Sequence, residues 1–323
     1  MSPTVLSIPI PECVAPPRRI PRSVVSGFWA HAALMVLFGC GTNEERAAGI
    51  RDDLGRMVEI TGTPERIVSL SPAITEILFA LDVDHRLVGR TQWDVYPPEA
   101  VGVPNVGEGM PPNVEAVAAV DPDLVIFYAS DANRQAMAQL AALGVTSFSV
   151  RVDLLRGLPN VIRALGTVTG SASRADQIAA AFQDRLDSTM AVPNQSAEPV
   201  RVMILTWDNP PIVIGGESFL NELVEMAGAE NIFSDIDAPS ASVSIETVAD
   251  RDPDVLLITT GSRVPSYASR SEWKVLRAVA EGRFAFVEGT EFEWPTTRSL
   301  DAVPRVRRAL LDAARRPVPV GVR

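Results

Sequence analysis

The chain has 323 residues, of which 46% are hydrophobic, and it carries a formal net charge of −11 with a pI near 4.8. This length and apolar content suffice for two domains with a core each, and they exclude a disordered or fibrous chain. The acidic balance argues against a nucleic-acid-binding protein, whose affinity would rest on clustered basic side chains facing phosphates. We therefore expect no nucleic-acid partner.

Residues 1–39 have the pattern of a signal peptide. A basic segment ending at Arg22 precedes an apolar stretch over residues 24–38. That stretch is too short and too interrupted for a membrane-spanning helix of about 20 residues, but it suits the apolar core of a signal peptide. The pattern predicts an exported protein.

The apolar stretch ends in the sequence LFGC, whose last residue is Cys40. This resembles a bacterial lipobox, although Phe38 is bulkier than is usual there. We predict that Cys40 is lipidated and anchors the mature chain to a membrane, with residues 40–52 as a tether. The alternative is an ordinary secretory signal. Cys13 is the only other cysteine, so the mature chain would contain no disulfide.

Residues 53–155 predict a first α/β lobe in which strands and helices alternate. A hairpin-like segment over residues 53–60 comes first. The predicted strands cover residues 66–70, 86–89, 124–128 and 146–150, and the predicted helices cover residues 71–81, 113–120 and 133–143. Alternation of this kind indicates a parallel sheet with right-handed crossovers.

Residues 156–192 predict connecting helices, and residues 193–317 predict a second α/β lobe. The connection reads as two helices broken at residues 166–170, the second starting near Ser173 and passing from lobe to lobe. In the second lobe the predicted strands cover residues 202–207, 255–259 and 284–288, and the predicted helices cover residues 219–227, 246–249, 272–281 and 301–314. Residues 193–199 read as a linker and residues 318–323 as a tail.

One unit occurs twice in the chain. Residues 113–126 read NVEAVAAVDPDLVI and residues 244–257 read SIETVADRDPDVLL. Each copy predicts a short helix, an Asp-Pro turn that ends it, and a strand covered on both faces. The repeat places Glu115 and Glu246 at equivalent points of two similar lobes. Glu76 and Glu222 form a second duplicated pair, which we interpret as structural.

Catalytic motifs are missing from the sequence. It has no nucleotide-binding glycine pattern, no zinc-protease pattern and no nucleophile elbow. His85 is the only histidine beyond the predicted signal peptide, so a metallohydrolase or a serine–histidine enzyme lacks its parts. We predict a protein that is not an enzyme and needs no cofactor and no metal.

Several motifs together resemble the cobalamin and iron-siderophore solute-binding proteins of ABC importers. They are RIVSLSP at residues 66–72, TE at 75–76, VGR at 88–90, YP at 96–97, NVE at 113–115, DPDLVI at 121–126 and FLNE at 219–222, followed by Gly228 and Asn231. The similarity runs from about Asp53 to about Pro317. It implies a class III periplasmic binding protein, with two Rossmann-like lobes with parallel sheets joined by a single long α-helix. It also implies a ligand cleft between the lobes, little hinge motion, and a monomer in the periplasm or on the outer face of the cytoplasmic membrane.

The resemblance also implies how the protein meets its membrane partner. In this family a glutamate on each lobe pairs with arginines of the two ABC permease subunits, and the motifs carry these roles to Glu115 and Glu246. Rim charges of this sort set docking register and association rate. The alternative is that each glutamate only stabilises the first turn of its helix, by about 0.3 to 1 kcal/mol.

Four aromatic residues are candidates for contact with a small-molecule ligand. Sites in parallel sheets lie beyond the carboxyl ends of strands, and the residues predicted there are Trp93, Tyr128, Trp207 and Trp294. The resemblance supports the same positions in cobalamin-binding relatives. We therefore favour a corrinoid as the transported ligand.

The sequence departs from the cobalamin pattern at Gly109 and Ser240, where well-known cobalamin binders have tryptophan. A ferric siderophore or other iron chelate is the alternative ligand. Arg298, and also Arg270, could serve such an oxygen-rich anion through the bidentate guanidinium. Two further alternatives are an enzyme or chaperone built on the same lobes and an extracytoplasmic sensor that has lost transport.

Overall fold

The computed structural model describes residues 49–191, 198–259 and 265–315. The chain divides into the units Met1–Glu44 and Glu45–Arg323. The predicted signal peptide, Cys40, most of the tether and the tail over residues 318–323 lie outside the described residues. Among the helices of the described part, none has the length and apolar character needed to cross a membrane.

The first lobe contains a parallel sheet of four strands in the order β4-β3-β5-β6. These strands are β3 (Ile67–Ser69), β4 (Leu87–Gly89), β5 (Leu124–Tyr128) and β6 (Thr146–Val150). The strands β1 (Gly49–Arg51) and β2 (Met57–Glu59) pair as a separate antiparallel hairpin. The predicted parallel sheet is confirmed. The entry hairpin begins earlier than predicted, because β1 lies in the part of the sequence interpreted as a tether and pairs with β2.

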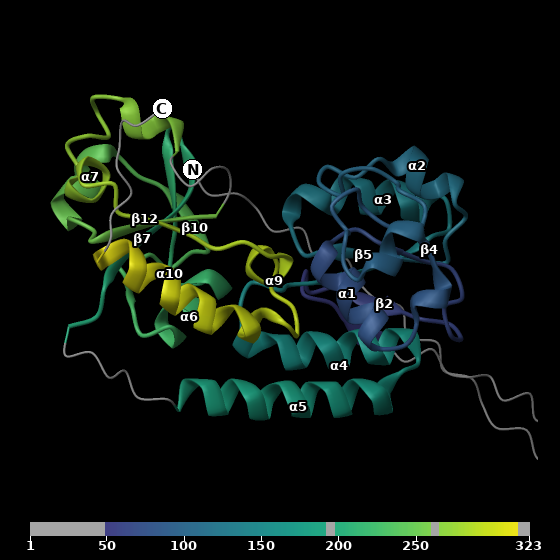
Figure 1. Ribbon diagram of the computed structural model, residues 1–323. Helices are drawn as coiled ribbons and strands as arrows, with labels where there is room; N and C mark the ends of the chain where they lie inside the picture. Colours follow the sequence, from purple (N-terminus) through teal and green to yellow (C-terminus); the bar gives the residue numbers. More distant parts are fainter. Residues whose placement is uncertain (1–48, 192–197, 260–264, 316–323) are drawn as a thin grey trace, which may run out of the picture. The chain divides into compact units, whose positions relative to one another are not determined.

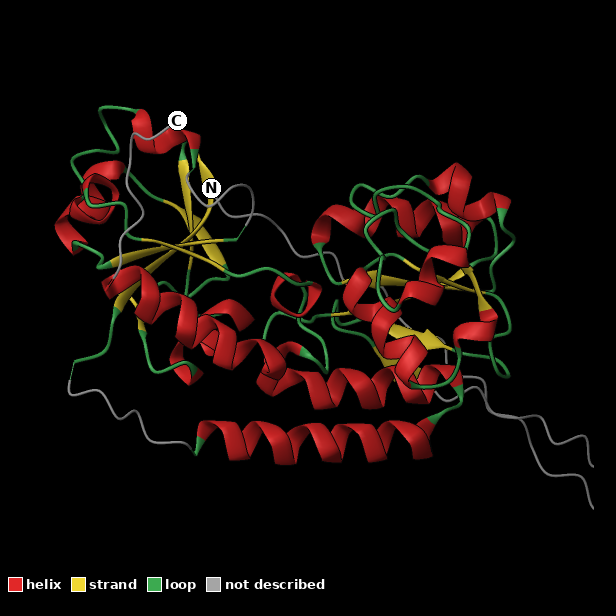
Figure 2. Cartoon of the chain, in the orientation of Figure 1, coloured by secondary structure: helices red, strands yellow, loops and turns green. Residues whose placement is uncertain are grey.

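The helices α1 (Pro72–Ala80), α2 (Val114–Ala119) and α3 (Arg134–Ala142) complete this lobe, with short 3₁₀ turns at Asp84–Arg86, Pro98–Gly102 and Asp131–Asn133. Helices cover both faces of the sheet (Figure 2). Alternate residues of β5 therefore enter different cores: Leu124 and Ile126 pack in one cluster, Val125 and Phe127 in another. This is why the strand is apolar at successive positions rather than at every second one.

Two helices lead from the first lobe to the second. After a 3₁₀ turn at Leu155–Gly157 come α4 (Leu158–Thr169) and α5 (Ala172–Met190), which pack side by side (Figure 1). Gly170, with φ of +76°, ends α4, which confirms the predicted break. A Cβ at Gly166 would lie 2.2 Å from the Cβ of Ala175, so the missing side chain lets the two helices approach closely.

Helix α5 contacts both lobes. Near its start, Arg174 Nε donates to the carbonyl oxygen of Ala80 at 3.2 Å in the first lobe. Near its end, Arg185 Nη2 lies 2.6 Å from Asp301 Oδ1 in the second lobe. The prediction that the second connecting helix passes from lobe to lobe agrees with these contacts.

The second lobe has a mixed sheet rather than a wholly parallel one. Its order is β10-β8-β7-β11-β12, with β9 beside β7. The strands are β7 (Arg201–Asp208), β8 (Pro211–Ile214), β9 (Glu230–Asn231), β10 (Ser240–Ser242), β11 (Val255–Ile258) and β12 (Phe284–Phe286). Strands β8 and β10 run antiparallel to their neighbours. The sequence did not reveal these two, because they are short and depend on pairing with other strands, β8 with β7 and β10 with β8.

Helices α6 (Phe219–Met226), α7 (Ile245–Arg251), α8 (Arg277–Ala280), α9 (Thr290–Glu293) and α10 (Val303–Arg315) belong to the second lobe, with 3₁₀ turns at Ser266–Ser269 and Ser299–Ala302. The helix predicted over residues 272–281 is reduced to α8. The ring of Trp273 is buried against Tyr267, with 4.3 Å between the ring centroids. This packing accompanies a series of turns in place of the first part of the predicted helix.

The repeated unit has the same local structure in both lobes. Asp121 and Asp252, which follow α2 and α7, have φ of 47° and 41°. An arginine at the start of a neighbouring strand then binds the free carbonyls of the helix end. Arg66 Nη2 donates to the carbonyl oxygen of Val120 at 2.6 Å, and Arg201 Nη2 donates to that of Arg251 at 2.8 Å. The two copies of the repeat are therefore similar in local structure as well as in sequence.

One apolar core extends through both lobes. It includes Ile74 of α1, Phe182 of α5, Leu223 of α6 and Val306 of α10, all buried. Smaller clusters fill the opposite face of each sheet. Because α4 and α5 contribute to the shared core, moving one lobe against the other would disturb packed side chains.

Candidate ligand-binding site

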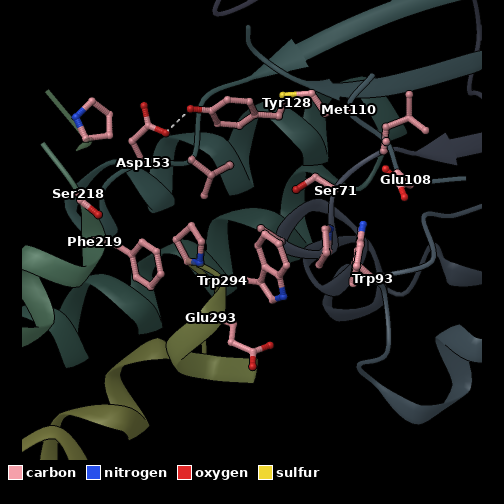
Figure 3. Close-up of a pocket in the computed structure, with 17 residues that line it drawn as sticks. Ser71, Trp93, Glu108, Met110, Tyr128, Asp153, Ser218, Phe219, Glu293 and Trp294 are labelled. Atoms are coloured by element: carbon pink, nitrogen blue, oxygen red, sulfur yellow. Dashed lines mark hydrogen bonds between the residues drawn. The ribbon is translucent and has the colours of Figure 1, made fainter. Parts of the chain in front are cut away.

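A cavity of about 420 Å³ lies between the two lobes (Figure 3). The first lobe contributes Tyr128 at the end of β5 and residues that follow β3, β4 and β6, and the second contributes residues beside β10, α6 and α9. The lining residues are Leu70, Ser71, Pro72, Ala73, Trp93, Glu108, Gly109, Met110, Tyr128, Val152, Asp153, Ser218, Phe219, Pro239, Glu293, Trp294 and Pro295. The position beyond the carboxyl ends of the first-lobe strands is where parallel sheets place ligands.

Four aromatic rings surround this cavity: Trp93, Tyr128, Phe219 and Trp294 (Figure 3). Trp93 is 51% exposed, and Trp294 is half-buried against the shared core. Tyr128 Oη donates to Asp153 Oδ1 at 2.5 Å, and burial raises the pKa of its phenol. Tyr128 thus presents a neutral ring with its polar end already satisfied.

Phe219 was missed by the sequence reasoning. It opens α6 directly after Ser218, which accepts a hydrogen bond from the Leu220 amide as the N-cap. Its amide also donates to the carbonyl oxygen of Asp153 at 2.6 Å, across from the first lobe. The available signal was the similarity of α6 to α1, since the start of α1 also lines the cavity.

Trp93 is supported by a buried carboxylate beside it in the chain. Asp94 is inaccessible to solvent and accepts hydrogen bonds from the hydroxyls of Thr91 and Thr75, the latter at 2.5 Å. Thr91 Oγ1 in turn accepts from the Trp93 amide at 3.3 Å. Burial raises the pKa of Asp94 above its ordinary value of 3.8, although these hydrogen bonds and Arg90 oppose the rise.

We expect the Asp94→Asn variant to lose less stability at pH 7 than at pH 4. A carboxyl with a raised pKa in the folded state holds its proton more tightly there, so its stabilising contribution is present below pH 3.8 and is lost as the pH rises through the raised pKa. Asparagine does not titrate. Urea unfolding of the parent protein and of the variant at pH 4 and pH 7 measures the two free energies of unfolding. If the variant lost as much stability at pH 7 as at pH 4, or more, the raised pKa of Asp94 would be contradicted.

The charged residues of the cavity wall are all acidic. They are Glu108, Asp153 and Glu293, and no arginine, lysine or histidine is found among the described lining residues. The negative charge of Asp153 is partly balanced by Arg151, whose Nη1 lies 3.4 Å from Asp153 Oδ2. Glu108 Oε1 accepts a hydrogen bond from Gln92 Nε2 at 3.3 Å. An anionic ligand would find no basic partner among these lining residues.

The structure brings together three of the five predicted ligand residues, Trp93, Tyr128 and Trp294. Trp207 and Arg298 do not line this cavity. Trp207 is 59% exposed near the end of β7, and its Nε1 donates to the carbonyl oxygen of Asn209 at 2.9 Å. The side chain of Arg298 is engaged by Glu76, with Nη2 2.6 Å from Oε2.

The two departures from the cobalamin pattern have different surroundings. Gly109 lines the cavity with φ of +88°, and a Cβ there would lie 2.7 Å from Thr91 Cγ2 and 2.9 Å from the carbonyl oxygen of Leu70. A tryptophan at this position would therefore need a different backbone. Ser240 is exposed in β10, directly after the lining residue Pro239.

Glu115 and Glu246 lie in the first turns of α2 and α7, and both are exposed. Each helix is capped by the residue before its first turn: Asn113 accepts from the Ala116 amide and Ser244 accepts from the Thr247 amide. Hydrogen bonds from its own amide and from Ser244 lower the pKa of Glu246. The repeat thus presents two solvent-facing carboxylates at matching positions of its two copies. Neither lines the cavity.

Over residues 49–191, 198–259 and 265–315, no three side chains of His, Cys, Asp or Glu are grouped so that they could hold a metal ion.

Comparison with known proteins places the chain in a family. The profile of the periplasmic binding protein family matches residues 67–289. A vitamin B12-binding protein of Vibrio cholerae serotype O1 is 28% identical over 242 residues, which cover 75% of this chain and 87% of that protein. An uncharacterized ABC transporter substrate-binding lipoprotein of Bacillus subtilis, YvrC, is 29% identical over 278 residues, covering 80% of this chain and 88% of that protein.

Solved structures give the same result. The periplasmic vitamin B12 binding protein BtuF of Vibrio cholerae has a TM-score of 0.65 at 28% identity, covering 77% of this chain and 98% of that one. The periplasmic heme-binding protein RhuT from Roseiflexus sp. RS-1 has a TM-score of 0.68 at 25% identity, covering 78% of this chain and all of that one. The predicted class of fold, with two Rossmann-like lobes, is confirmed. The chain belongs to the periplasmic binding protein family and is a substrate-binding protein rather than an enzyme.

Proposed function

We propose that this protein captures a corrinoid in the interlobe cavity and delivers it to the permease of an ABC importer. The observation that carries the proposal is the cavity wall, which combines aromatic rings with carboxylates and lacks basic side chains among its described residues. A corrinoid has a broad apolar ring edge and neutral amide arms, which suit such a wall. The relatives named for vitamin B12 support the same ligand class.

An anionic ferric siderophore fits this wall less well. Its oxygen-rich charge calls for arginine or lysine. Of the two predicted candidates, Arg298 is bound to Glu76, and Arg270 pairs with Asp208, with Nη1 2.8 Å from Oδ2. Carboxylates at Glu108 and Glu293 would repel an anion in a partly desolvated cleft. An iron chelate therefore remains the alternative only in a neutral or cationic form.

Trp93, Tyr128 and Trp294 are proposed as direct ligand contacts, and Trp207 as a contact beyond the cavity wall. A corrinoid is larger than a cavity of about 420 Å³, so part of it would extend past the rim. The exposed indole of Trp207 is available to cover that part. We propose for Arg298 a positioning role rather than a ligand contact.

Delivery would use Glu115 and Glu246, which we propose to pair with arginines of the two permease subunits. The protein would act as a monomer outside the cytoplasm, in the periplasm or on the outer face of the cytoplasmic membrane. A lipid on Cys40 would hold it there, as the lipoprotein name of the Bacillus subtilis relative suggests.

Calorimetric titration of residues 41–323 tests the ligand class. We expect one-to-one binding of cyanocobalamin and cobinamide, no binding of the anionic ferric enterobactin, and at most weak binding of the cationic ferrioxamine B. Enterobactin and ferrioxamine differ in charge sign, so the pair separates charge exclusion from rejection of iron chelates as a class. Binding of ferric enterobactin with no response to either corrinoid would refute the proposal.

A further inference from the structure

The duplicated glutamates Glu76 and Glu222 both reach out of their own lobes. Glu76 lies on α1 of the first lobe, and its side chain is only 8% exposed. It accepts two hydrogen bonds from Arg298 of the second lobe, from Nε at 2.9 Å and from Nη2 at 2.6 Å. This is a bidentate pair, the strongest geometry for a guanidinium and a carboxylate.

Arg298 is held in place by both lobes. On its own side, Nη2 donates to Thr290 Oγ1 at 3.0 Å, and Nη1 lies 3.5 Å from Glu291 Oε2. On the other side, its Cζ lies 3.4 Å from the ring centroid of Tyr96, a first-lobe residue. Its two neighbours from the first lobe, Glu76 and Tyr96, thus bind the guanidinium by an ion pair and by a cation–π contact.

Glu222 makes the reciprocal connection. It lies on α6 of the second lobe with a side chain 11% exposed, and its Oε2 accepts from the Leu155 amide at 2.5 Å. Arg156 Nε lies 3.5 Å from its Oε1. Leu155 and Arg156 belong to the segment that leaves the first lobe after β6. The carboxylate of the second lobe is therefore tied to the chain emerging from the first.

Both connections adjoin the cavity. The start of α1 and the loop residue Trp93 line it on the side of Glu76 and Tyr96, while Trp294 lines it just before Arg298. Beside Glu222, the lining residues are Asp153 and Phe219. The residues of the Glu76–Arg298 contact thus lie close in the chain to the lining residues Ala73 and Trp294, and those of the Glu222 contact lie close to the lining residues Asp153 and Phe219.

We propose that Glu76 and Glu222 are positioning residues that act as a pair of interlobe clasps and hold the ligand cleft at its binding width before the ligand arrives. The clasps are the contact of Glu76 with Arg298 and that of Glu222 with Leu155 and Arg156. The proposal deepens the proposed function, since it explains how that cavity is preformed. Contacts at two separate points resist both opening and twisting of the cleft. Because hydrogen bonds and ion pairs are directional, they fix the cleft width more closely than the shared apolar core would alone.

The interlobe distance in the ligand-free protein tests this. Residues 41–323 contain no cysteine, so Val101→Cys and Val275→Cys, at positions 55% and 64% exposed in the first and second lobes, can carry two spin labels. With both clasps intact, we expect one narrow distance distribution that cyanocobalamin leaves unchanged. In Glu76→Gln/Glu222→Gln we expect a broader distribution that the ligand narrows, with affinity weakened about tenfold because a smaller fraction of the protein is competent to bind.

Two comparisons separate this role from general stability. Asp235→Asn breaks the pair with Arg251, 2.5 Å apart and wholly within the second lobe, and should leave both distribution and affinity unchanged even if melting shifts. Glu76→Gln/Arg298→Gln leaves no unpaired buried charge, and a folded protein with a broadened distribution is expected again. If both clasp variants keep the narrow distribution of the parent, the proposal is overturned.

The distance measurement without ligand does not depend on what the ligand is. Broadening without any corrinoid binding would therefore support the clasps and refute only the proposed ligand. Corrinoid binding with unchanged distance distributions would refute the clasps and leave the proposed function standing.

Discussion

Changing both Glu115 and Glu246 to lysine is expected to abolish ligand uptake by cells while leaving the affinity of the isolated protein unchanged. Both carboxylates are exposed, and neither lines the cavity. If each meets an arginine of the permease, reversal replaces attraction with like-charge contact at two points, which costs several kcal/mol. Uptake of radiolabelled cyanocobalamin, beside calorimetry on the purified protein, measures the two effects separately.

The matched control is Glu99→Lys with Glu230→Lys. These glutamates are also exposed, one in each lobe, and the net charge changes by the same amount. Near-normal uptake in this control would show that position rather than total charge matters. The docking variant should stay folded, because a lysine in a first helical turn costs only about 0.3 to 1 kcal/mol. Retained uptake in that variant would show that the two glutamates serve only their helices.

Removing both tryptophan side chains that line the cavity, with Trp93→Ala and Trp294→Ala, is expected to weaken corrinoid binding by a factor of about 1,000. Aromatic anchors at the centre of an interface commonly contribute about 2 kcal/mol or more each, which is a factor of about 30 per residue. Trp93 is half-exposed, so its loss should barely change the melting temperature. Trp294 packs against the shared core, and its loss should lower that temperature.

Trp207→Ala provides the comparison for this prediction. Trp207 lies outside the cavity wall, so we expect its loss to weaken binding by less than about tenfold. Calorimetry on the single variants Trp93→Ala, Trp294→Ala and Trp207→Ala and on the double variant gives the affinities that test both expectations. A greater loss from Trp207→Ala than from the double variant would place the ligand over the end of β7 instead.

Local patterns in the sequence were enough to place most of the fold. The Asp-Pro turns end α2 and α7 because the residue before proline avoids the helical region. The apolar runs at Leu124–Tyr128 and Val255–Ile258 are strands because both faces of each sheet are covered. The same local reasoning placed Glu115 and Glu246 in the first turns of equivalent helices.

Long-range contacts determined what local patterns could not. Strand β8 exists as a partner of β7, so its four residues carry little signal of their own. Arg298 was expected to bind an anionic ligand, yet its guanidinium meets a carboxylate 222 positions earlier in the chain. No local spacing reveals a pair so far apart in sequence.

The sequence by itself determined the two-lobed α/β plan and the duplicated surface carboxylates, and its first 39 residues predict export. Each of these depends on periodicity or on signals a few residues apart. Only the tertiary structure decided which aromatic side chains share a cavity, that Gly109 cannot accept a side chain without backbone change, and that Glu76 and Glu222 reach across to the other lobe. These features depend on how strand ends and helix starts from two lobes meet. That meeting is set by packing of the whole core and not by any single segment.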